Sequence, residues 1–341
     1  MKNDPPLAHS HAPTRVLVSQ RLMSPSVGYV DQIVGEDQND VIFEAFSGLP
    51  RATDVDVVHL HRLSALGGAR ARSGKKRVAV ALAFAARIRS NGIALVRTWH
   101  GADANDAGGR SARLANWILN RVTTEFVIVD PSTKVPNGAS GTLIPYGHYR
   151  ERFVGYPRSP QVPGRLLCIA AHLHTSVERF VRDYVEGDVR ETTLRVVGSA
   201  GPARAARLRE FAETGKDSVS TRIERVSDGA MVMEISASEL VVLPNAGELD
   251  DLHMVFLALS LDRPVLVPDS PLMRSVADSV GAEWVHRSTA PLDPAVAAEV
   301  LSSVRTDTPP DGPSLDGRDR EATSAMYADV FRAAAKKTSR R

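Results

Sequence analysis

The feature that most constrains the fold is an alternation of short apolar runs with helical patterns, which begins near residue 15. Apolar runs at 15–19, 55–60, 93–98 and 125–130 are separated by stretches such as 77–89, whose apolar residues recur at helical spacing. Neighbouring parallel strands need a long crossover connection, and a helix supplies one. The alternation therefore predicts an open parallel sheet with helices packed on its faces.

A proline-rich break separates this first series from a second one. Residues 156–164 contain three prolines and end on Gly164. Proline fixes the backbone and removes a hydrogen-bond donor, so this segment is interpreted as a linker. After it, apolar runs at 166–171, 194–198, 240–244 and 264–268 again alternate with helical patterns.

The two series predict an α/β fold with two doubly wound, Rossmann-like lobes that face each other across a cleft. A chain of 341 residues is long enough for two such domains. The expected division has a disordered lead-in, a first lobe, a linker, a second lobe and a C-terminal helix. These parts span 1–13, 14–155, 156–164, 165–317 and 318–341.

The composition excludes some classes of protein. Lys and Arg number 42 against 40 Asp and Glu, whereas nucleic-acid binders carry a clearer basic excess, so no nucleic-acid partner is expected. Cys168 is the only cysteine, so no internal disulfide can form and a reducing compartment is expected. No apolar run reaches the length of a membrane span, and residues 1–14 lack the apolar core of a secretory signal. We therefore expect a cytoplasmic protein.

Ligands of such sheets bind beyond the carboxyl ends of the strands, so the residues after each predicted strand are the candidates for a site. The first strand is followed by a small polar turn that holds Ser26 and Gly28. The backbone N–H groups of such a turn suit a phosphate, although many ordinary turns have the same composition. The third strand is followed by His100, which can reach into the cleft and donate to a phosphate or a sugar hydroxyl, or can simply pack.

Two further groups of histidines stand near predicted strand ends in the first lobe. His59 and His61 alternate along the second strand and therefore share one face. A metal site needs a third ligand, and none lies nearby in the sequence, so we expect one histidine to be buried and the other to lie in the cleft. Near the linker, His148, Tyr149 and Arg150 either contact a ligand or hold the lobes together.

In the second lobe, polar residues again follow the predicted strands. His172 and His174 follow the first of them, and Gly198 follows the next in a stretch that does not match a dinucleotide-binding fingerprint. The loop at 244–253 is acidic, and its side chains either bind ribose hydroxyls or are solvated. Its candidate donor-binding residues are Glu248, Asp251 and His253.

Taken together, these segments resemble the GT-B glycosyltransferases, specifically the family 4-like branch of bacterial exopolysaccharide and related pathways. The matching stretches follow the order of that family and are 56–61, 98–101, 144–149, 194–198, 238–244, 258–267 and 280–285.

The resemblance implies transfer of a sugar from a nucleotide-sugar donor to an acceptor, with retention of the anomeric configuration. It places the donor diphosphate on the second lobe and the acceptor on the first, and it requires no metal or other cofactor. It implies a catalytic position for His100, near the sugar and phosphate of the donor, while Ser26 and Gly28 approach the phosphate or the acceptor. The helix that begins near Arg318 resembles the one that crosses back onto the first lobe.

The sequence departs from the family where charge matters most. Family members place an Arg and a Lys after the first strand of the second lobe, where they offset charge on the leaving diphosphate. Here His172 and His174 occupy that turn, and histidine is mostly neutral near pH 7. Many family members also carry a pair of glutamates in the second lobe, and Leu257 occupies the position of the second one here. These differences predict a degenerate donor-diphosphate site.

Three functions are therefore compatible with the sequence. The first is an active glycosyltransferase with an unusual donor pocket, acting on an unidentified acceptor such as a lipid-linked saccharide or a polysaccharide. The second is a non-catalytic GT-B homologue that serves as partner or scaffold of an active glycosyltransferase, and the third is a small-molecule-binding or epimerising protein of the same fold. The basic stretch at 70–89 also predicts weak peripheral association with an anionic membrane at its inner face, unless it is a solvated helix end.

Overall fold

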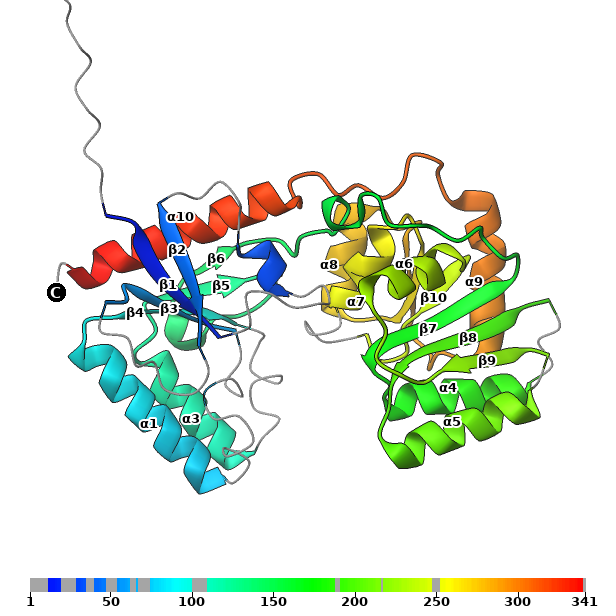
Figure 1. Cartoon of the computed structure of the whole chain (residues 1–341), viewed down its shortest axis with the longest axis horizontal. Coiled ribbons are helices and arrows are strands. Elements are labelled where there is room, and N and C mark those ends of the chain that lie inside the picture. The colour runs from blue at the N-terminus through cyan, green and yellow to red at the C-terminus, as the bar shows by residue number, and fades with distance from the viewer. Residues whose placement is uncertain are drawn as a thin grey trace, which may run out of the picture.

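The computed structural model contains two parallel sheets, each in its own lobe. The residues that it describes are 12–19, 29–34, 40–46, 54–61, 66, 74–99, 109–187, 191–215, 217–246 and 252–339. The first sheet has the strand order β2-β1-β3-β4-β5-β6, and the second has the order β12-β11-β10-β7-β8-β9. Neighbouring strands of each sheet pair in parallel. This is the two-lobed α/β architecture that the sequence predicts (Figure 1).

The strands are short, and the central ones are apolar on both faces, as parallel strands covered by helices require. In the first lobe they are β1 (Thr14–Val18), β2 (Val41–Ala45), β3 (Val57–Leu60), β4 (Ala94–Thr98), β5 (Glu125–Ile128) and β6 (Gly141–Leu143). In the second lobe they are β7 (Arg165–His172), β8 (Thr193–Ser199), β9 (Val219–Arg222), β10 (Leu240–Val242), β11 (Val265–Pro268) and β12 (Val285–Ser288).

Helices cover the faces of both sheets. Those of the first lobe are α1 (Gly74–Ser90), α3 (Arg110–Asn120) and the C-terminal α10 (Arg320–Ser339), together with the short 3-10 helix η1 (Tyr29–Gln32). Those of the second lobe are α4 (Thr175–Glu186), α5 (Pro202–Thr214), α6 (Asp228–Ser236), α7 (Leu252–Leu259), α8 (Pro271–Val280) and α9 (Pro294–Asp307). The described residues also include the 3-10 turns η4 (Pro136–Gly138) and η5 (Glu151–Phe153).

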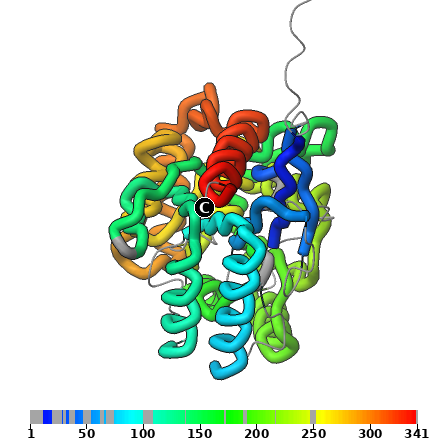
Figure 2. The backbone as a smooth tube through the Cα atoms, turned by 90° about the vertical axis from the view of Figure 1, so that its left-hand side faces the viewer, coloured from blue at the N-terminus to red at the C-terminus, as the bar shows by residue number. Residues whose placement is uncertain are grey.

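The C-terminal helix α10 returns to the first lobe, as the resemblance implied. It packs against β1, β3 and β4. The helices α1 and α3 lie side by side on the opposite side of the sheet (Figures 1 and 2). Tyr327 and Phe331 of α10 are buried in the same cluster as Val57 and Val96 of the first sheet. That cluster continues into the second lobe, so the cores of the two lobes meet at the junction.

Within the part of the chain that the structure describes, no helix is both long and apolar enough to cross a bilayer.

Gly198 allows β7 and β8 to approach closely near their carboxyl ends. Its φ of +145° is rare for residues with a side chain, and a Cβ placed there would overlap the carbonyl oxygen of Ala170. The pairing register of the two strands shifts at the same point, between Ala170 and His172. Gly198 thus has a packing reason to be glycine, whatever its part in donor binding.

We predict that Gly198→Ala lowers the free energy of unfolding by more than about 2 kcal/mol, because it adds both backbone strain and an overlap with backbone. Gly201→Ala is the matched control, since a Cβ at Gly201 meets nothing within 4 Å, and it should cost less than about 1 kcal/mol. Urea unfolding of the two variants measures the difference. Equal losses would show that the close approach at Gly198 is not what requires glycine.

Candidate functional site

The carboxyl edges of the two sheets are the places where a ligand is expected. Ser26, Gly28, His100, Glu248 and Asp251 lie outside the described residues, so their roles stay predictions. The described residues around the strand ends show what supports this region.

A buried polar cluster lies at the carboxyl ends of β3 and β4. His59 Nε2 is 2.9 Å from Thr98 Oγ1, and the hydroxyl of Tyr29 is 3.2 Å from the same oxygen. The ring of Tyr29 stacks on His61, with centroids 4.1 Å apart, and its hydroxyl also contacts that of Tyr327 from α10. The C-terminal helix therefore takes part in holding these strand ends.

The structure buries both histidines rather than one. His59 is 1% exposed, and His61 is 8% exposed and is stacked by Tyr29, while a position of His61 in the cleft stays a prediction. Burial raises the pKa of Tyr29 to about 12 and also raises that of Tyr327. Both phenols therefore stay protonated at neutral pH.

The turn between β7 and α4 brings a helix amino terminus to the carboxyl edge of the second sheet. His172 ends β7, and its side chain lies outside the described ones, whereas His174 is exposed and is the N-cap residue of α4. The side chain of His174 accepts no capping bond. A helix start of this kind, after a strand of an α/β sheet, is where anions bind.

Arg204 supplies a cation at this turn from a different element. It stands in the first turn of α5 and donates from Nη1 to the carbonyl oxygen of Leu173 (2.9 Å) and from Nη2 to Thr175 Oγ1 (2.9 Å). Its charge is partly shared with Glu178, which also pairs with Arg207. Two guanidinium groups and one carboxylate leave a net positive charge beside the start of α4.

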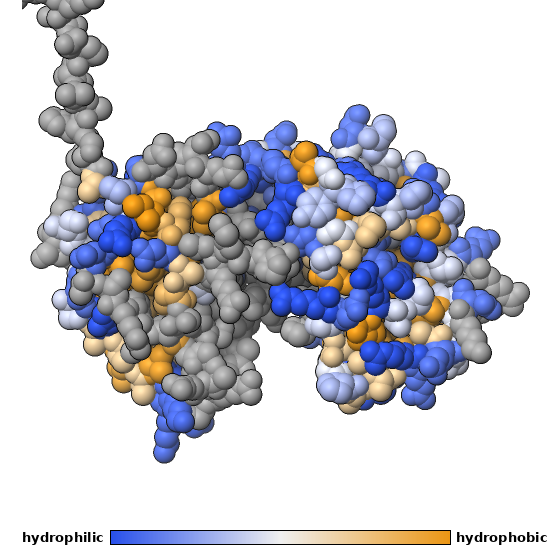
Figure 3. Space-filling view, viewed as in Figure 1, coloured by the Kyte–Doolittle hydropathy of each residue, from blue (hydrophilic) through white to orange (hydrophobic). Residues whose placement is uncertain are grey.

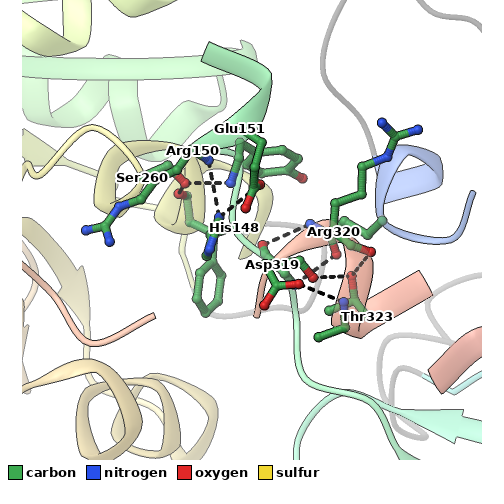
Figure 4. Close-up of polar contacts among 12 residues, drawn as sticks. His148, Arg150, Glu151, Ser260, Asp319, Arg320 and Thr323 are labelled. Atoms are coloured by element: carbon green, nitrogen blue, oxygen red, sulfur yellow. Dashed lines mark hydrogen bonds and ion pairs between the residues drawn. The ribbon is translucent and has the colours of Figure 1, made fainter. Parts of the chain in front are cut away.

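His148, Tyr149 and Arg150 follow one another where the chain crosses between the lobes, and Figure 4 shows His148 and Arg150 near Ser260. The backbone N–H of His148 donates to the carbonyl oxygen of Arg318 (2.7 Å). The backbone N–H of Tyr149 donates to Ser260 Oγ (2.9 Å), and Arg150 pairs with Asp262 at 2.8 Å. All three residues therefore contact either the second lobe or the segment around Arg318 that leads back to the first lobe, as the interlobe interpretation expects.

His253, one of the candidate donor-binding residues of the second lobe, contacts the interlobe segment at 148–150. It stands in the first turn of α7, and its Nδ1 is 2.9 Å from the hydroxyl of Tyr149, which is 3.1 Å from that of Tyr146. Burial lowers the pKa of His253 to about 4. The imidazole is therefore neutral at physiological pH and adds no positive charge for a diphosphate.

A cavity of about 570 Å³ lies elsewhere in the second lobe, between the linker, β7–β9 and α6. Arg165, at the start of β7, and Arg195 line it, so it lies toward the amino ends of these strands. It is not the place where α/β sheets bind their ligands. Among the described residues, no group of three His, Cys, Asp or Glu side chains could hold a metal ion.

The lowered pKa of His253 predicts a loss of stability in acid. A histidine has a pKa of about 6.5 in the unfolded chain, so as pH falls from about 6.5 toward 4 the unfolded state takes up the proton first. The free energy of unfolding then falls, by about 2–3 kcal/mol for this group at pH 4.5. Thermal unfolding of the wild type and of His253→Asn between pH 7.5 and 4.5 should show a shallower pH dependence for the variant.

The matched control is His174→Asn, because His174 is exposed, and its pH dependence should run parallel to that of the wild type. Burial also lowers the pKa values of His148 and His286, so the His253 variant keeps part of the acid sensitivity. Identical slopes for the wild type and His253→Asn would contradict the assignment.

Comparison with known proteins places these features in a family. No family model matches the chain. Two GDP-mannose:glycolipid 4-beta-D-mannosyltransferases of Xanthomonas campestris pv. campestris are each 31% identical to it over 268 residues, which cover 77% of this chain and 76% of the relative.

Solved structures show the same fold at low sequence identity. HepE from Anabaena in complex with UDP-glucose aligns with a TM-score of 0.59 at 12% identity, over 96% of this chain and 98% of that one. A putative UDP-N-acetylglucosamine 2-epimerase from Listeria monocytogenes aligns with a TM-score of 0.53 at 12% identity, over 95% and 96%. The predicted GT-B fold is confirmed, and the chain belongs to the GT-B glycosyltransferase family that includes the GDP-mannose:glycolipid 4-beta-D-mannosyltransferases.

Proposed function

We propose that this chain transfers mannose from GDP-mannose to a lipid-linked saccharide acceptor. The observation that carries the proposal is the 31% identity to two enzymes named for that donor and a glycolipid acceptor, over 77% of this chain. The proposal narrows the sequence-based expectation of a nucleotide-sugar donor and an unidentified acceptor. It keeps the expected setting, which is the cytoplasm with peripheral association at the inner face of the membrane.

We propose that the donor diphosphate binds at the start of α4, with Arg204 as the nearby cation. The family's Arg and Lys after the first strand of the second lobe are replaced here by His172 and His174. The contacts of Arg204 with Leu173 and Thr175 support it as a substitute, because they fix its guanidinium at that turn. A preformed cation beside a helix start favours the charge that develops on a leaving diphosphate.

The residues outside the described ranges keep the roles that the sequence predicts. His100 is proposed to contact the donor near its sugar and phosphate, and Ser26 and Gly28 to approach the phosphate or the acceptor. Glu248 and Asp251 are proposed to bind ribose hydroxyls. We propose that no metal or other cofactor takes part.

The stereochemical outcome distinguishes two forms of the proposal. The resemblance to the family 4-like branch implies retention, whereas a β-mannoside made from GDP-mannose, an α-linked donor, requires inversion. We propose the β-mannoside, because it rests on 31% identity along most of the chain rather than on separate short matches. An inverting transfer needs a general base at the acceptor hydroxyl, by the same logic that separates inverting from retaining glycosidases.

One observation favours the alternative of a non-catalytic partner or scaffold of an active glycosyltransferase. Leu257, which stands where family members carry the second glutamate, is fully buried in the apolar core. A buried apolar side chain at this position offers no hydrogen bond to a donor, which supports the proposal of a degenerate donor site. Co-purification with an active transferase, together with failure to bind any sugar nucleotide, would support that alternative.

Calorimetry with GDP-mannose and UDP-glucose tests the proposal. We expect the wild type to bind GDP-mannose more tightly than UDP-glucose and His100→Ala to bind it more weakly. Arg204→Ala should weaken binding at least about tenfold, because it removes a charged hydrogen-bond donor. Arg209→Ala, at an exposed position of the same helix, is the control and should bind like the wild type.

A transfer assay completes the test. GDP-mannose and a membrane lipid extract should yield a mannosylated lipid, and the one-bond carbon–proton coupling at its anomeric centre in NMR distinguishes a β from an α product. Release of free mannose alone, or conversion of GDP-mannose to another sugar nucleotide without acceptor, would contradict the proposal. An α product would restore the expectation of retention.

A further inference from the structure

Two neighbouring helices of the first lobe present cations and large apolar side chains on one surface. The helices α1 and α3 pack against each other on the side of the sheet away from α10 (Figures 1 and 2). They begin side by side, since a Cβ placed on Gly74 would lie 2.8 Å from Ser111 Oγ. Both are crossover helices of one parallel sheet, so both start at its carboxyl edge.

The exposed side of α3 is a single stripe. Its exposed residues recur at helical spacing, and together with the capping residue after the helix they are Arg110, Arg113, Leu114, Trp117 and Arg121. Leu114 is 47% exposed and Trp117 is 50% exposed. The Arg121 guanidinium lies 4.3 Å from the centroid of the Trp117 ring. Cations and large apolar groups therefore share this stripe.

The exposed side of α1 has the same character in a different order. Along one stripe stand Lys75, Ala79, Leu82, Ala86 and Arg89, all of them exposed. Leu82 is 53% exposed and lies in the apolar middle of this stripe, which has a cation at either end. The space-filling view shows this apolar band along the lower part of the first lobe, with hydrophilic residues at its tip (Figure 3).

The charge on this surface has one sign. Neither helix contains an acidic residue, while α1 carries five Lys and Arg residues and α3 carries two. Most protein partners offer charges of both signs, and a solvated surface has no need of an exposed tryptophan. Cations interleaved with Trp and Leu suit the headgroup region of an anionic bilayer, where the apolar groups enter and the cations meet lipid phosphates.

We propose that the α1–α3 surface, made of these ten residues, docks the protein on an anionic bilayer, with Leu82, Leu114 and Trp117 at headgroup depth. The inference rests on the proposed function for its purpose, which is access to a lipid-linked acceptor. It moves the docking site beyond the basic stretch at 70–89 to include α3, whose exposed tryptophan supplies the anchor.

The tryptophans of this chain make the docking measurable without a label. The three are Trp99 and Trp284, which are buried, and Trp117, which is half exposed. On addition of vesicles with 30 mol% phosphatidylglycerol in phosphatidylcholine, we expect a blue shift of fluorescence and quenching by brominated lipid chains. Vesicles of phosphatidylcholine alone should give neither, and the protein should float only with the anionic vesicles.

A pair of charge reversals tests the residues. Arg110→Glu combined with Arg113→Glu should weaken partitioning at least about 25-fold, taking roughly fivefold for each cation at an anionic surface. Arg179→Glu, at an exposed position of α4 in the second lobe, is the control and should bind vesicles nearly as the wild type does. Leu114→Ser should reduce the quenching by brominated lipid, because it removes part of the inserted apolar surface.

Several outcomes would overturn the inference. They are equal binding to neutral and anionic vesicles, equal effects of the α3 reversals and of Arg179→Glu, or sedimentation showing that this surface pairs two copies of the chain. Calorimetry with GDP-mannose on the same preparations separates this proposal from the proposed function. Vesicle binding without donor binding overturns the function and leaves the docking, and donor binding without vesicle binding does the reverse.

Discussion

The relative position of the two lobes depends on the hydrogen bonds of Arg318. Its Nη1 donates to the carbonyl oxygen of Tyr146 (2.8 Å), and its Nη2 donates to Ser279 Oγ in the second lobe (2.9 Å). Its guanidinium lies 5.0 Å from the ring centroid of Phe256, and its own carbonyl accepts from His148. The Arg318 side chain thus joins three parts of the protein. They are the segment at 146–150, by which the chain leaves the first lobe, the segment around Arg318, by which it returns, and the core of the second lobe. Loss of this side chain would remove both hydrogen bonds and leave the part-buried carbonyl oxygen of Tyr146 without this donor.

Around this point the junction is fixed by backbone as well as side chains. Gln32 exchanges two hydrogen bonds with the backbone of Gly147, at 2.9 and 3.0 Å. A Cβ on Gly147 would lie 3.0 Å from the carbonyl oxygen of Arg318. The two segments that connect the lobes, around Gly147 and around Arg318, are therefore in close contact. The bond between Tyr149 and His253 extends the same network to the start of α7. A movement of one lobe against the other therefore changes the surroundings of the candidate donor side.

The sequence predicts the central strands but not the edges of either sheet. The apolar runs identify β1, β3, β4 and β5 in the first lobe and β7, β8, β10 and β11 in the second. The strands that it misses, β2, β6, β9 and β12, are the four edge strands. An edge strand is buried on fewer sides, so polar residues such as Glu44 in β2 and His286 and Arg287 in β12 interrupt its apolar pattern. The strand signal used here is a burial signal, and it fades where burial ends.

The same limit applies to the candidate site. His148, Tyr149 and Arg150 could be found because they follow a strand and precede a linker. Arg204 could not, because it reaches the β7–α4 turn from a helix about thirty residues further along the chain, and ordinary surface helices also carry arginines. Tyr327 meets Tyr29 only through the return of α10. Contacts between distant segments depend on the packing of whole elements, which local patterns do not contain.

The return of α10 also sets the order in which the lobes can mature. The second lobe is one continuous stretch, so all of its strands and helices are available once that stretch has left the ribosome. The first lobe is discontinuous, because the face of β1, β3 and β4 that α10 covers stays bare until residues 320–339 are made. Although synthesis begins with the first lobe, its core is the one completed last. A chain released before that final helix would expose the apolar face of its oldest sheet.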